Sequence, residues 1–336
     1  MKRGLFLIFC CCMVMVFCLG SAVAAPKKIE ISLSCAMPDT HPVVVEFNKL
    51  IKEMEERSGG TMTGVVYPSA QMGGDVQVHH SILDHAVGMI WSTTASQVTF
   101  VPDLAIFDIP FLFANRQEAE KVFTDKEFMD IIGQKYEKAG FKLFGFDVTG
   151  FRWLSANRPV RKMEDLKGLK IRTMENPYHV AFWRALGVSP TPLANSERYT
   201  ALQQGTVDGQ ENILENAYLT RLYEVQSDFM NTRHLVFLGV WVMDLQLWKE
   251  MSKEQQDLFT ELLEKYRAQS TKDLNAREET IIKELREKYK KTIWEDLEPG
   301  EYERWRDTAR PAAETLVRKA VGNELVDLLY KVRDKK

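Results

Sequence analysis

The stretch LKGLKIRTMENPYHVAFWRALG, residues 166–187, contains a complete strand-to-helix unit. The apolar run within residues 168–174 predicts a strand. Asn176 followed by Pro177 is typical of a helix start, because asparagine caps the first turn and proline fits the first helical position. The helix then ends at Gly187. Arg172 therefore lies at the end of a strand, where an open α/β sheet usually binds its ligand.

Further strand and helix patterns flank this unit on both sides. IEISLSCAM (29–37) alternates apolar and polar residues, a helix with one apolar face follows at 39–60, and MTGVVYP (62–68) is strand-like again. This order is typical of an α/β fold with a mostly parallel sheet. LQQGTVDGQE (202–211) resembles ILDHAVGMIW (82–91), since each runs from a helix end through a tight turn into a strand. The similarity indicates two lobes built alike.

Length and later patterns predict two lobes joined by a long helix. The 336-residue chain is long enough for two compact domains, and its turn-rich segment 150–168 predicts the crossing into the second. The helical pattern over 253–291 is polar all round in its middle, as expected for a helix that leaves one packed body and joins another. We expect the first lobe to comprise residues 26–149 and about 238–277, and the second 150–237 and about 278–336.

The first 25 residues have the pattern of a secretory signal peptide. Lys2 and Arg3 precede an apolar run, and small residues follow it, which predicts cleavage near Ala24 or Ala25. The alternative, a membrane anchor, is disfavoured because the run is short for a spanning helix. Four of the five cysteines lie in this segment, so the mature chain keeps only Cys35 and forms no internal disulfide. We expect an exported, periplasmic protein.

The charge balance excludes several classes of partner. The formal net charge is -3, with 27% charged residues of both signs. This is not the basic surface that binds nucleic acid or an anionic membrane. We therefore expect a small ligand and no nucleic acid.

Three polar residues at strand ends are candidate ligand contacts. Arg172 can bind a carboxylate through two parallel hydrogen bonds, which lysine cannot match; its alternative is a local ion pair with an acid such as Glu175. Asn212, after the turn at Gly209, offers both a donor and an acceptor, and its alternative is to cap the next helix. Arg152 lies at the predicted crossing between lobes, where its alternative is an interdomain surface position.

Four tryptophans lie close to predicted strand ends or to segments between the lobes. Aromatic side chains there can stack on a ligand or cover it, although core packing is their common alternative. Trp91 and Trp153 are the stronger candidates because they adjoin the polar candidates. The other two are Trp183 and Trp241.

No sequence pattern predicts catalysis, a metal or a cofactor. In HHSILDH (79–85) a helix would bring His80 and Asp84 together, but nothing nearby completes a zinc set. There is no G-x-S-x-G, no H-E-x-x-H and no glycine-rich phosphate loop, and Cys35 has no activating partner in sequence. We expect no catalytic residues.

Five motifs together resemble one family. In chain order they are VYPSAQMGGD, FDIPFLF, LKGLKIRTMENP, GVSPTPLANSERYTALQQG and ALQQGTVDGQEN. Over essentially the whole mature chain, the sequence resembles the substrate-binding proteins of tripartite ATP-independent periplasmic (TRAP) transporters. The resemblance implies an α/β, two-lobe periplasmic binding protein fold, with a ligand cleft between the lobes and a long helix spanning both.

The resemblance also implies roles for individual residues. Arg172 matches the arginine that forms the principal salt bridge to the ligand carboxylate, and Asn212 matches an asparagine that lies against the same ligand. Arg152 matches a second cationic contact, and Asp75 matches a first-lobe position that can reach substrate hydroxyls.

The sequence departs from sialate-binding members of that family. Those members have an acidic residue next to the position of Trp91 and Ser92, and an aromatic residue at the position of Asn195. Ile213 replaces a frequent proline after Asn212. These departures argue against sialic acid and leave sugar acids, short hydroxy or oxo acids, dicarboxylates and aromatic acids open.

The function implied is capture and delivery. Two lobes close on a small organic acid, and the loaded protein delivers it to the membrane subunits of a TRAP permease, which an ion gradient drives without an ATPase. One alternative is a solute sensor that presents the bound acid to a receptor. Another is an enzyme in the same cleft, which would need an activated acid, base or metal beside the arginines.

Overall fold

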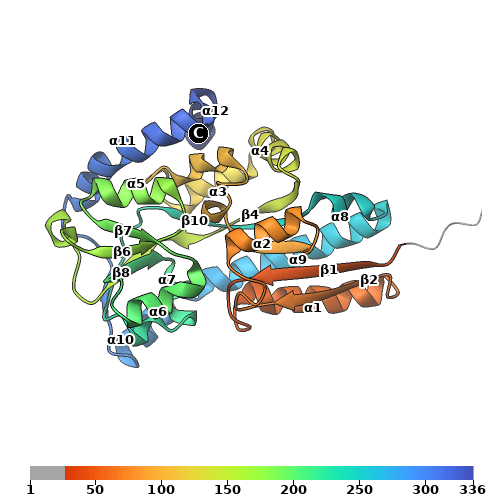
Figure 1. Ribbon diagram of the computed structural model, residues 1–336, viewed down its shortest axis with the longest axis horizontal. Helices are drawn as coiled ribbons and strands as arrows, with labels where there is room; N and C mark the ends of the chain where they lie inside the picture. Colours follow the sequence, from red (N-terminus) through yellow and green to blue (C-terminus); the bar gives the residue numbers. More distant parts are fainter. Residues whose placement is uncertain (1–26, 336) are drawn as a thin grey trace, which may run out of the picture.

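The computed structural model describes residues 27–335 and contains two β-sheets. The five-stranded sheet has the order β2-β1-β3-β10-β4, and the six-stranded sheet has the order β11-β9-β5-β8-β6-β7. Figure 1 shows the two sheets in opposite halves of the molecule, each with its own helices. The predicted signal peptide, residues 1–25, lies outside the described residues.

The five-stranded sheet forms the core of the first lobe. Its strands are β1 (Ile29–Cys35), β2 (Met62–Tyr67), β3 (Met89–Thr93), β4 (Phe141–Phe151) and β10 (Val236–Asp244). β1 pairs in parallel with β2 and β3, whereas β10 runs antiparallel to β3 and β4. Side chains alternate between the faces of a strand, and a buried apolar cluster packs on each face of this sheet. Helices α1 (Pro42–Arg57) and α9 (Lys253–Ala276) cover one face, and α2 (Asp75–Leu83), α3 (Arg116–Thr124) and α4 (Lys126–Lys138) cover the other.

The six-stranded sheet forms the core of the second lobe. Its strands are β5 (Trp153–Ala156), β6 (Lys170–Thr173), β7 (Ser189–Pro192), β8 (Gly209–Asn212), β9 (Asp228–Met230) and β11 (Thr292–Trp294). β6 is parallel to β7 and β8, and β5 runs antiparallel to β8 and β9. Helices α5 (Pro177–Ala185) and α11 (Glu301–Val321) pack on one face, and α6 (Arg198–Gln203), α7 (Leu214–Leu219) and α10 (Glu278–Glu287) pack on the other.

The described chain passes between the lobes three times before α11. β4 continues into β5 through Arg152, β9 returns to β10, and α9 continues into α10 with a bend at Arg277. The backbone N–H of Arg152 donates to the carbonyl of Leu235 at 2.9 Å, so the first two crossing segments are hydrogen-bonded to each other. The predicted α/β two-lobe fold is confirmed, with the long helix realised as two consecutive helices.

Short elements and the C-terminal helices complete the described chain. The short elements are η1 (Thr94–Ser96), η2 (Pro102–Asp108), η3 (Met163–Leu166), η4 (Asn195–Glu197), η5 (Leu222–Glu224) and α8 (Leu245–Glu250). α11 packs against α5 and η2, whereas α12 (Asn323–Arg333) packs against α3 and α4. The sequence predicts that about 278–336 belong to the second lobe, whereas in the structure α12 lies on helices of the first.

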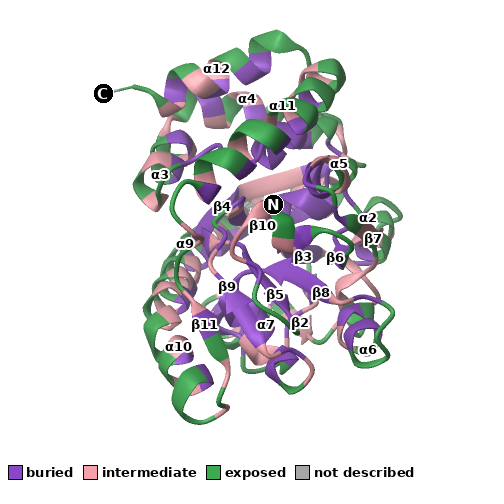
Figure 2. Cartoon of the chain, turned by 90° about the vertical axis from the view of Figure 1, so that its left-hand side faces the viewer, coloured by how far each residue is buried: buried purple, intermediate pink, exposed green. Residues whose placement is uncertain are grey.

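The strand-to-helix unit of residues 166–187 forms as predicted. The side-chain oxygen of Asn176 accepts hydrogen bonds from the backbone N–H groups of Tyr178 and His179 at 2.9 and 3.1 Å, and Pro177 begins α5. This cap fixes the chain directly after β6 and so fixes where Arg172 leaves the sheet. Figure 2 shows the strands buried inside the molecule and the exposed residues concentrated on the outer helices. None of the helices in residues 27–335 is long and apolar enough to cross a membrane.

Candidate binding site between the lobes

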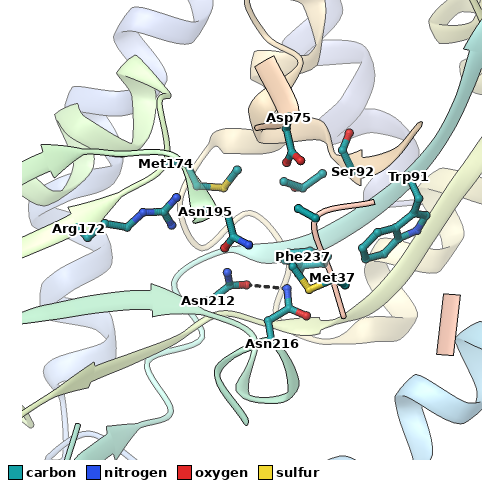
Figure 3. Close-up of a pocket in the computed structure, with 12 residues that line it drawn as sticks. Met37, Asp75, Trp91, Ser92, Arg172, Met174, Asn195, Asn212, Asn216 and Phe237 are labelled. Carbon is teal, nitrogen blue, oxygen red and sulfur yellow. Dashed lines mark hydrogen bonds between the residues drawn. The ribbon is translucent and has the colours of Figure 1, made fainter. Parts of the chain in front are cut away.

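A cavity lies where strand ends of both lobes meet. It contains about 380 Å³ of space not filled by protein atoms, including space open to solvent. The first lobe lines it from the ends of β1 and β3, the start of α2, and β10, with Ala36, Met37, Asp75, Trp91, Ser92, Thr93 and Phe237. The second lobe lines it from β6, β8, η4 and α7, with Arg172, Met174, Asn195, Asn212 and Asn216. Figure 3 shows these side chains around the cavity.

Arg172 is a buried cation with one unused donor. Its side chain is 1% exposed, and Nε and Nη2 both donate to the carbonyl of Leu193, at 2.9 and 2.5 Å. Nη1 is buried and has no hydrogen-bond partner within residues 27–335. Among the described residues no carboxylate forms an ion pair with Arg172, so the alternative pairing with Glu175 is not formed. A buried charge without a full set of partners is unfavourable, so an anion in the cavity would stabilise it.

The pKa of Arg172 leaves it charged at neutral pH. Burial lowers this pKa to about 10, opposed by the attraction of Glu211 and reinforced by the repulsion of Arg152. The guanidinium therefore remains positive at physiological pH, and Figure 3 shows it extending toward Asn195 and Met174.

Asp75 is the acid of the cavity, contributed by the first lobe. It is the first residue of α2, and Figure 3 shows its carboxylate reaching into the site. Burial raises the pKa of Asp75 to about 6, opposed by the hydrogen bond from Ser96 and the attraction of Arg172. An acid and an arginine thus face one cavity from different lobes.

Asp75→Asn is expected to stabilise the ligand-free protein at pH 8. The pKa of Asp75 is raised from 3.8 to about 6, so its contribution to stability is fully present below the unfolded value and is lost as the pH rises through the folded value. Asparagine lacks this penalty, and we expect the free energy of unfolding to rise by about 2 kcal/mol at pH 8. The gain should shrink as the pH falls toward about 4.

Urea unfolding of the parent and of Asp75→Asn across this pH range measures the effect. Asp84→Asn is the matched control, because Asp84 is an exposed acid at the other end of α2. A gain that does not depend on pH, or one that Asp84→Asn reproduces, would contradict the assignment to the Asp75 carboxylate.

Three asparagines of the second lobe supply neutral polar groups. The side-chain oxygen of Asn212 accepts from the N–H of Ile213 at 2.8 Å and from the side-chain amide of Asn216 at 3.2 Å, the bond drawn in Figure 3. The side-chain oxygen of Asn216 is buried and has no hydrogen-bond partner in the described part of the chain. Asn212 thus bonds to the first turn of α7 through the side chain of Asn216, whereas the cap residue Ile213 makes no side-chain cap bond. The amide of Asn195 lies between Arg172 and Asp75 in Figure 3.

Trp91 and Phe237 form the apolar wall. The indole N–H of Trp91 donates to Asp147 at 3.3 Å, and that of Trp241 donates to the same oxygen at 2.7 Å. The ring of Trp91 lies 5.1 Å from His41 and 6.3 Å from Phe237, measured between ring centres. Because its polar atom is occupied on the protein side, Trp91 presents an apolar surface to the cavity.

Arg152 lies one layer behind the cavity. It forms a bidentate ion pair with Glu211 through Nε and Nη2, and Nη2 also donates to the backbone carbonyl of Glu211 at 2.9 Å. Its guanidinium lies 5.6 Å from the ring centre of Phe237, which does line the cavity. Burial opposes ionisation of Glu211, but the attraction of Arg152 and hydrogen bonds from His234 and Arg152 hold its pKa below the usual range.

Trp153 belongs to the core of the second lobe. It lies opposite Asn212 in the pairing of β5 with β8 and packs in the cluster that contains Leu214 and Phe229. It also lines a separate surface depression beside the start of α10. Four of the six candidates, Asp75, Trp91, Arg172 and Asn212, therefore line the cavity, and Arg152 and Trp153 support it from outside.

Several residues that line the cavity carry no clear signal in the sequence. Asn216 lies in α7 and Asn212 ends β8, so no single periodicity in the sequence links the two side chains. Met37, Met174 and Phe237 had no signal that separates them from core residues. Ser92 and Asn195 also line the cavity, at positions where the sequence departs from sialate-binding relatives. The hydroxyl of Ser92 accepts from the side-chain amide of Gln97 at 2.8 Å.

The histidines of residues 79–85 do not form one cluster. His79 is buried and contacts the backbone carbonyl of Asp75, whereas His85 is exposed and bonds to Asp244 at 2.9 Å. Within residues 27–335 no three His, Cys, Asp or Glu side chains are arranged to hold a metal ion.

Two lobes of this α/β design, with a buried cation in a cavity between them, form the arrangement expected of a solute-binding protein. The chain belongs to the bacterial extracellular solute-binding protein family 7, whose sequence model matches residues 33–320. A solute-binding protein of Verminephrobacter eiseniae is 32% identical over 240 residues, which cover 71% of each chain.

Solved structures of similar proteins contain bound acids. A sugar acid binding protein of Advenella mimigardefordensis in complex with galactonate is 25% identical with a TM-score of 0.86, over 92% of this chain and 99% of that one. A TRAP periplasmic solute-binding protein of Polaromonas bound to D-erythronate is 26% identical with a TM-score of 0.83, over 92% and 99% of the two chains.

Proposed function

We propose that this protein captures a small organic acid between its lobes and delivers it to the membrane subunits of a TRAP permease. The observation behind the proposal is the buried, unpartnered Nη1 of Arg172 at the cavity. A carboxylate is the group that best satisfies a guanidinium, because charge-assisted hydrogen bonds are short and strong. Family membership and the acids bound by similar proteins support the same ligand class.

The residues act in this proposal from both lobes. Arg172 binds the carboxylate and Asn212 donates from its side-chain amide beside it. Asp75 and Trp91 contact the ligand from the first lobe. Arg152 and Trp153 position the site: Arg152 supports Phe237 from behind, and Trp153 holds the strand next to Asn212.

Capture follows from the arrangement of the two lobes. A ligand that touches residues of both lobes has more contacts when they are closed, and its differential affinity favours the closed state. Closure also removes water from around Arg172, which strengthens its interaction with the carboxylate. The protein would act after export, with residues 1–25 removed as a signal peptide and with no ATPase partner. The proposed role is binding, without a chemical step.

Thermal unfolding of the chain from Pro26 onward, with a panel of acids, tests the proposal. Each sugar acid, hydroxy or oxo acid, dicarboxylate and aromatic acid is paired with its neutral amide or alcohol. A ligand at 100 times its dissociation constant should stabilise the protein by about 2.7 kcal/mol, and its amide should not. Native mass spectrometry of the purified protein first checks for acid retained from expression. A folded, ligand-free protein that responds to no carboxylate would contradict the proposal.

A further inference from the structure

We infer that Asp147 and Gly239, which lie behind the cavity, hold Trp91 as its end wall and so set the longest acid that fits. This inference rests on the proposed function and adds two residues that select the ligand by its length without touching it. It follows from the path of the Trp91 side chain across the first sheet and from its place opposite Arg172.

Trp91 and Arg172 lie at opposite ends of the cavity. Figure 3 shows the guanidinium of Arg172 at one end and the indole of Trp91 at the other, with Asp75 between them. The two residues come from different lobes, Arg172 from β6 and Trp91 from β3. A carboxylate bound to Arg172 therefore directs the rest of the acid toward Trp91, and the position of this ring limits how far the acid can extend.

The indole of Trp91 lies across neighbouring strands of the first sheet. Trp91 belongs to β3, its ring lies over Gly239 of β10, and its N–H donates to Asp147 of β4 at 3.3 Å. The strand registers explain this path, since Gly239 pairs with Thr93 on one side and with Asp147 on the other. Residues two apart on a strand share a face, so Trp91, Gly239 and Asp147 lie on the same face of the sheet.

Gly239 provides the space in which the ring lies. A Cβ atom at position 239 would be 2.8 Å from Cζ2 of the Trp91 ring and 3.0 Å from its Cε2 and Nε1, closer than packed carbon atoms approach one another. The backbone of Gly239 does not itself require glycine, because its φ lies outside the left-handed region. Glycine inside a strand often marks the close approach of another group, and here that group is the indole.

Asp147 fixes the direction of the ring. It is 3% exposed, and one of its oxygens accepts from the indole N–H groups of both Trp91 and Trp241. An indole N–H is only a donor, so without this carboxylate the N–H of Trp91 would lose its acceptor. The sheet and the buried His41, 5.1 Å away between ring centres, enclose the indole, so a displaced ring moves toward the cavity.

Two series of acids that grow by one carbon at a time measure the length limit in calorimetric titrations. Glycerate, D-erythronate, xylonate, galactonate and glucoheptonate form one series, and malonate, succinate, glutarate, adipate and pimelate form the other. One methylene group more or less in an apolar pocket is worth about 10–200-fold in discrimination. We expect the wild-type chain to bind one acid of either series at least about tenfold more tightly than its next longer homologue.

Gly239→Ala and Trp91→Leu should shift this limit in opposite directions. The added Cβ displaces the indole into the cavity, so Gly239→Ala should favour a shorter acid, and the ratio of the dissociation constants of the longer and shorter acids should rise about tenfold or more. Leucine is smaller than tryptophan, so Trp91→Leu should accept a longer acid. Combining the two substitutions should cancel the shortening, because the Cβ then has no indole to displace.

Gly133→Ala is the matched control for the added methyl group. Gly133 lies on α4 of the same lobe, and a Cβ atom there would meet no atom within 4 Å. This variant should therefore keep the length preference of the wild-type chain.

Asp147→Leu and Asp147→Asn test the hydrogen bond that positions the ring. Asparagine keeps an acceptor oxygen and should retain the length preference, whereas leucine should reduce the discrimination between neighbouring homologues to less than about threefold. Near-ultraviolet circular dichroism tests the same point without ligand. The Trp91 band, taken as the difference between each variant and its Trp91→Leu counterpart, should weaken in Asp147→Leu and persist in Asp147→Asn.

The outcomes distinguish the inference from the function beneath it. If Gly239→Ala folds and keeps the wild-type length preference, if Trp91→Leu admits no longer acid, or if Asp147→Leu discriminates as the wild type does, the inference is wrong while acid capture stands. If Gly239→Ala does not fold, Trp91→Leu and the two Asp147 variants decide the question. If no carboxylate binds the wild-type chain, the proposed function fails and the length limit fails with it.

Discussion

Arg172→Lys is expected to lower the affinity for the captured acid by roughly 100-fold or more while the protein stays folded. Arg172 donates from Nε and Nη2 to the backbone carbonyl of Leu193, so Nη1 is available to the ligand. Lysine keeps the positive charge but has a single nitrogen. It therefore cannot donate to the Leu193 carbonyl and to the ligand carboxylate with the geometry of the guanidinium. Truncating one partner of a buried charged pair typically costs about 2–5 kcal/mol of binding.

Isothermal titration with the tightest-binding acid of the panel measures this loss. Arg184→Lys is the matched control, because Arg184 is an exposed arginine on α5 of the same lobe. Circular dichroism spectra of both variants should match the parent. If the dissociation constant of Arg172→Lys lies within about threefold of the parent value, the paired N–H donors of the guanidinium have no role in binding.

Glu211→Gln is expected to destabilise the protein by about 3–5 kcal/mol, because Arg152 would be left as a buried charge without its counter-ion. Both side chains are almost fully buried, and His234 also bonds to Glu211 at 3.1 Å. The pKa of Glu211 is held below its usual range, so this contribution is present above the unfolded value of 4.5 and is lost as the pH falls through the folded value. Urea unfolding at pH 7 measures the change.

A double-mutant cycle separates the pair from its surroundings. Arg152→Met combined with Glu211→Leu removes both charges, and we expect the double variant to be more stable than either single variant. If the losses in free energy of unfolding of the two single variants add up to the loss of the double variant, Arg152 and Glu211 do not interact directly. An unfolding midpoint of Glu211→Gln equal to that of the parent would show that the buried pair does not hold the crossing between the lobes.

Local patterns were sufficient to predict the elements around the site. Asn176 and Pro177 predicted the start of α5, and the apolar run before them predicted β6, which together place Arg172 at the cavity. The similarity of 202–211 to 82–91 also has a structural counterpart, because α6 leads to β8 as α2 leads to β3. Strand ends meet at one edge of a sheet, so polar residues there were good candidates.

Tertiary contacts explain what the patterns could not predict. Arg152 was placed at the crossing, but its partner Glu211 lies 59 positions away, and no local signal links them. The helical periodicity over 253–291 contains no glycine or proline, yet the helix bends at Arg277, which pairs with Glu215 of the second lobe at 3.1 Å. Phe237 reaches the cavity because β10 returns antiparallel to the middle of the first sheet.

The most direct test of the central claim is a crystal structure of the protein with the tightest-binding acid of the panel. We predict the acid in the cavity between the lobes, with its carboxylate within hydrogen-bond distance of Nη1 of Arg172. A structure with the acid bound elsewhere, or bound in the cavity with its carboxylate turned away from Arg172, would contradict the account.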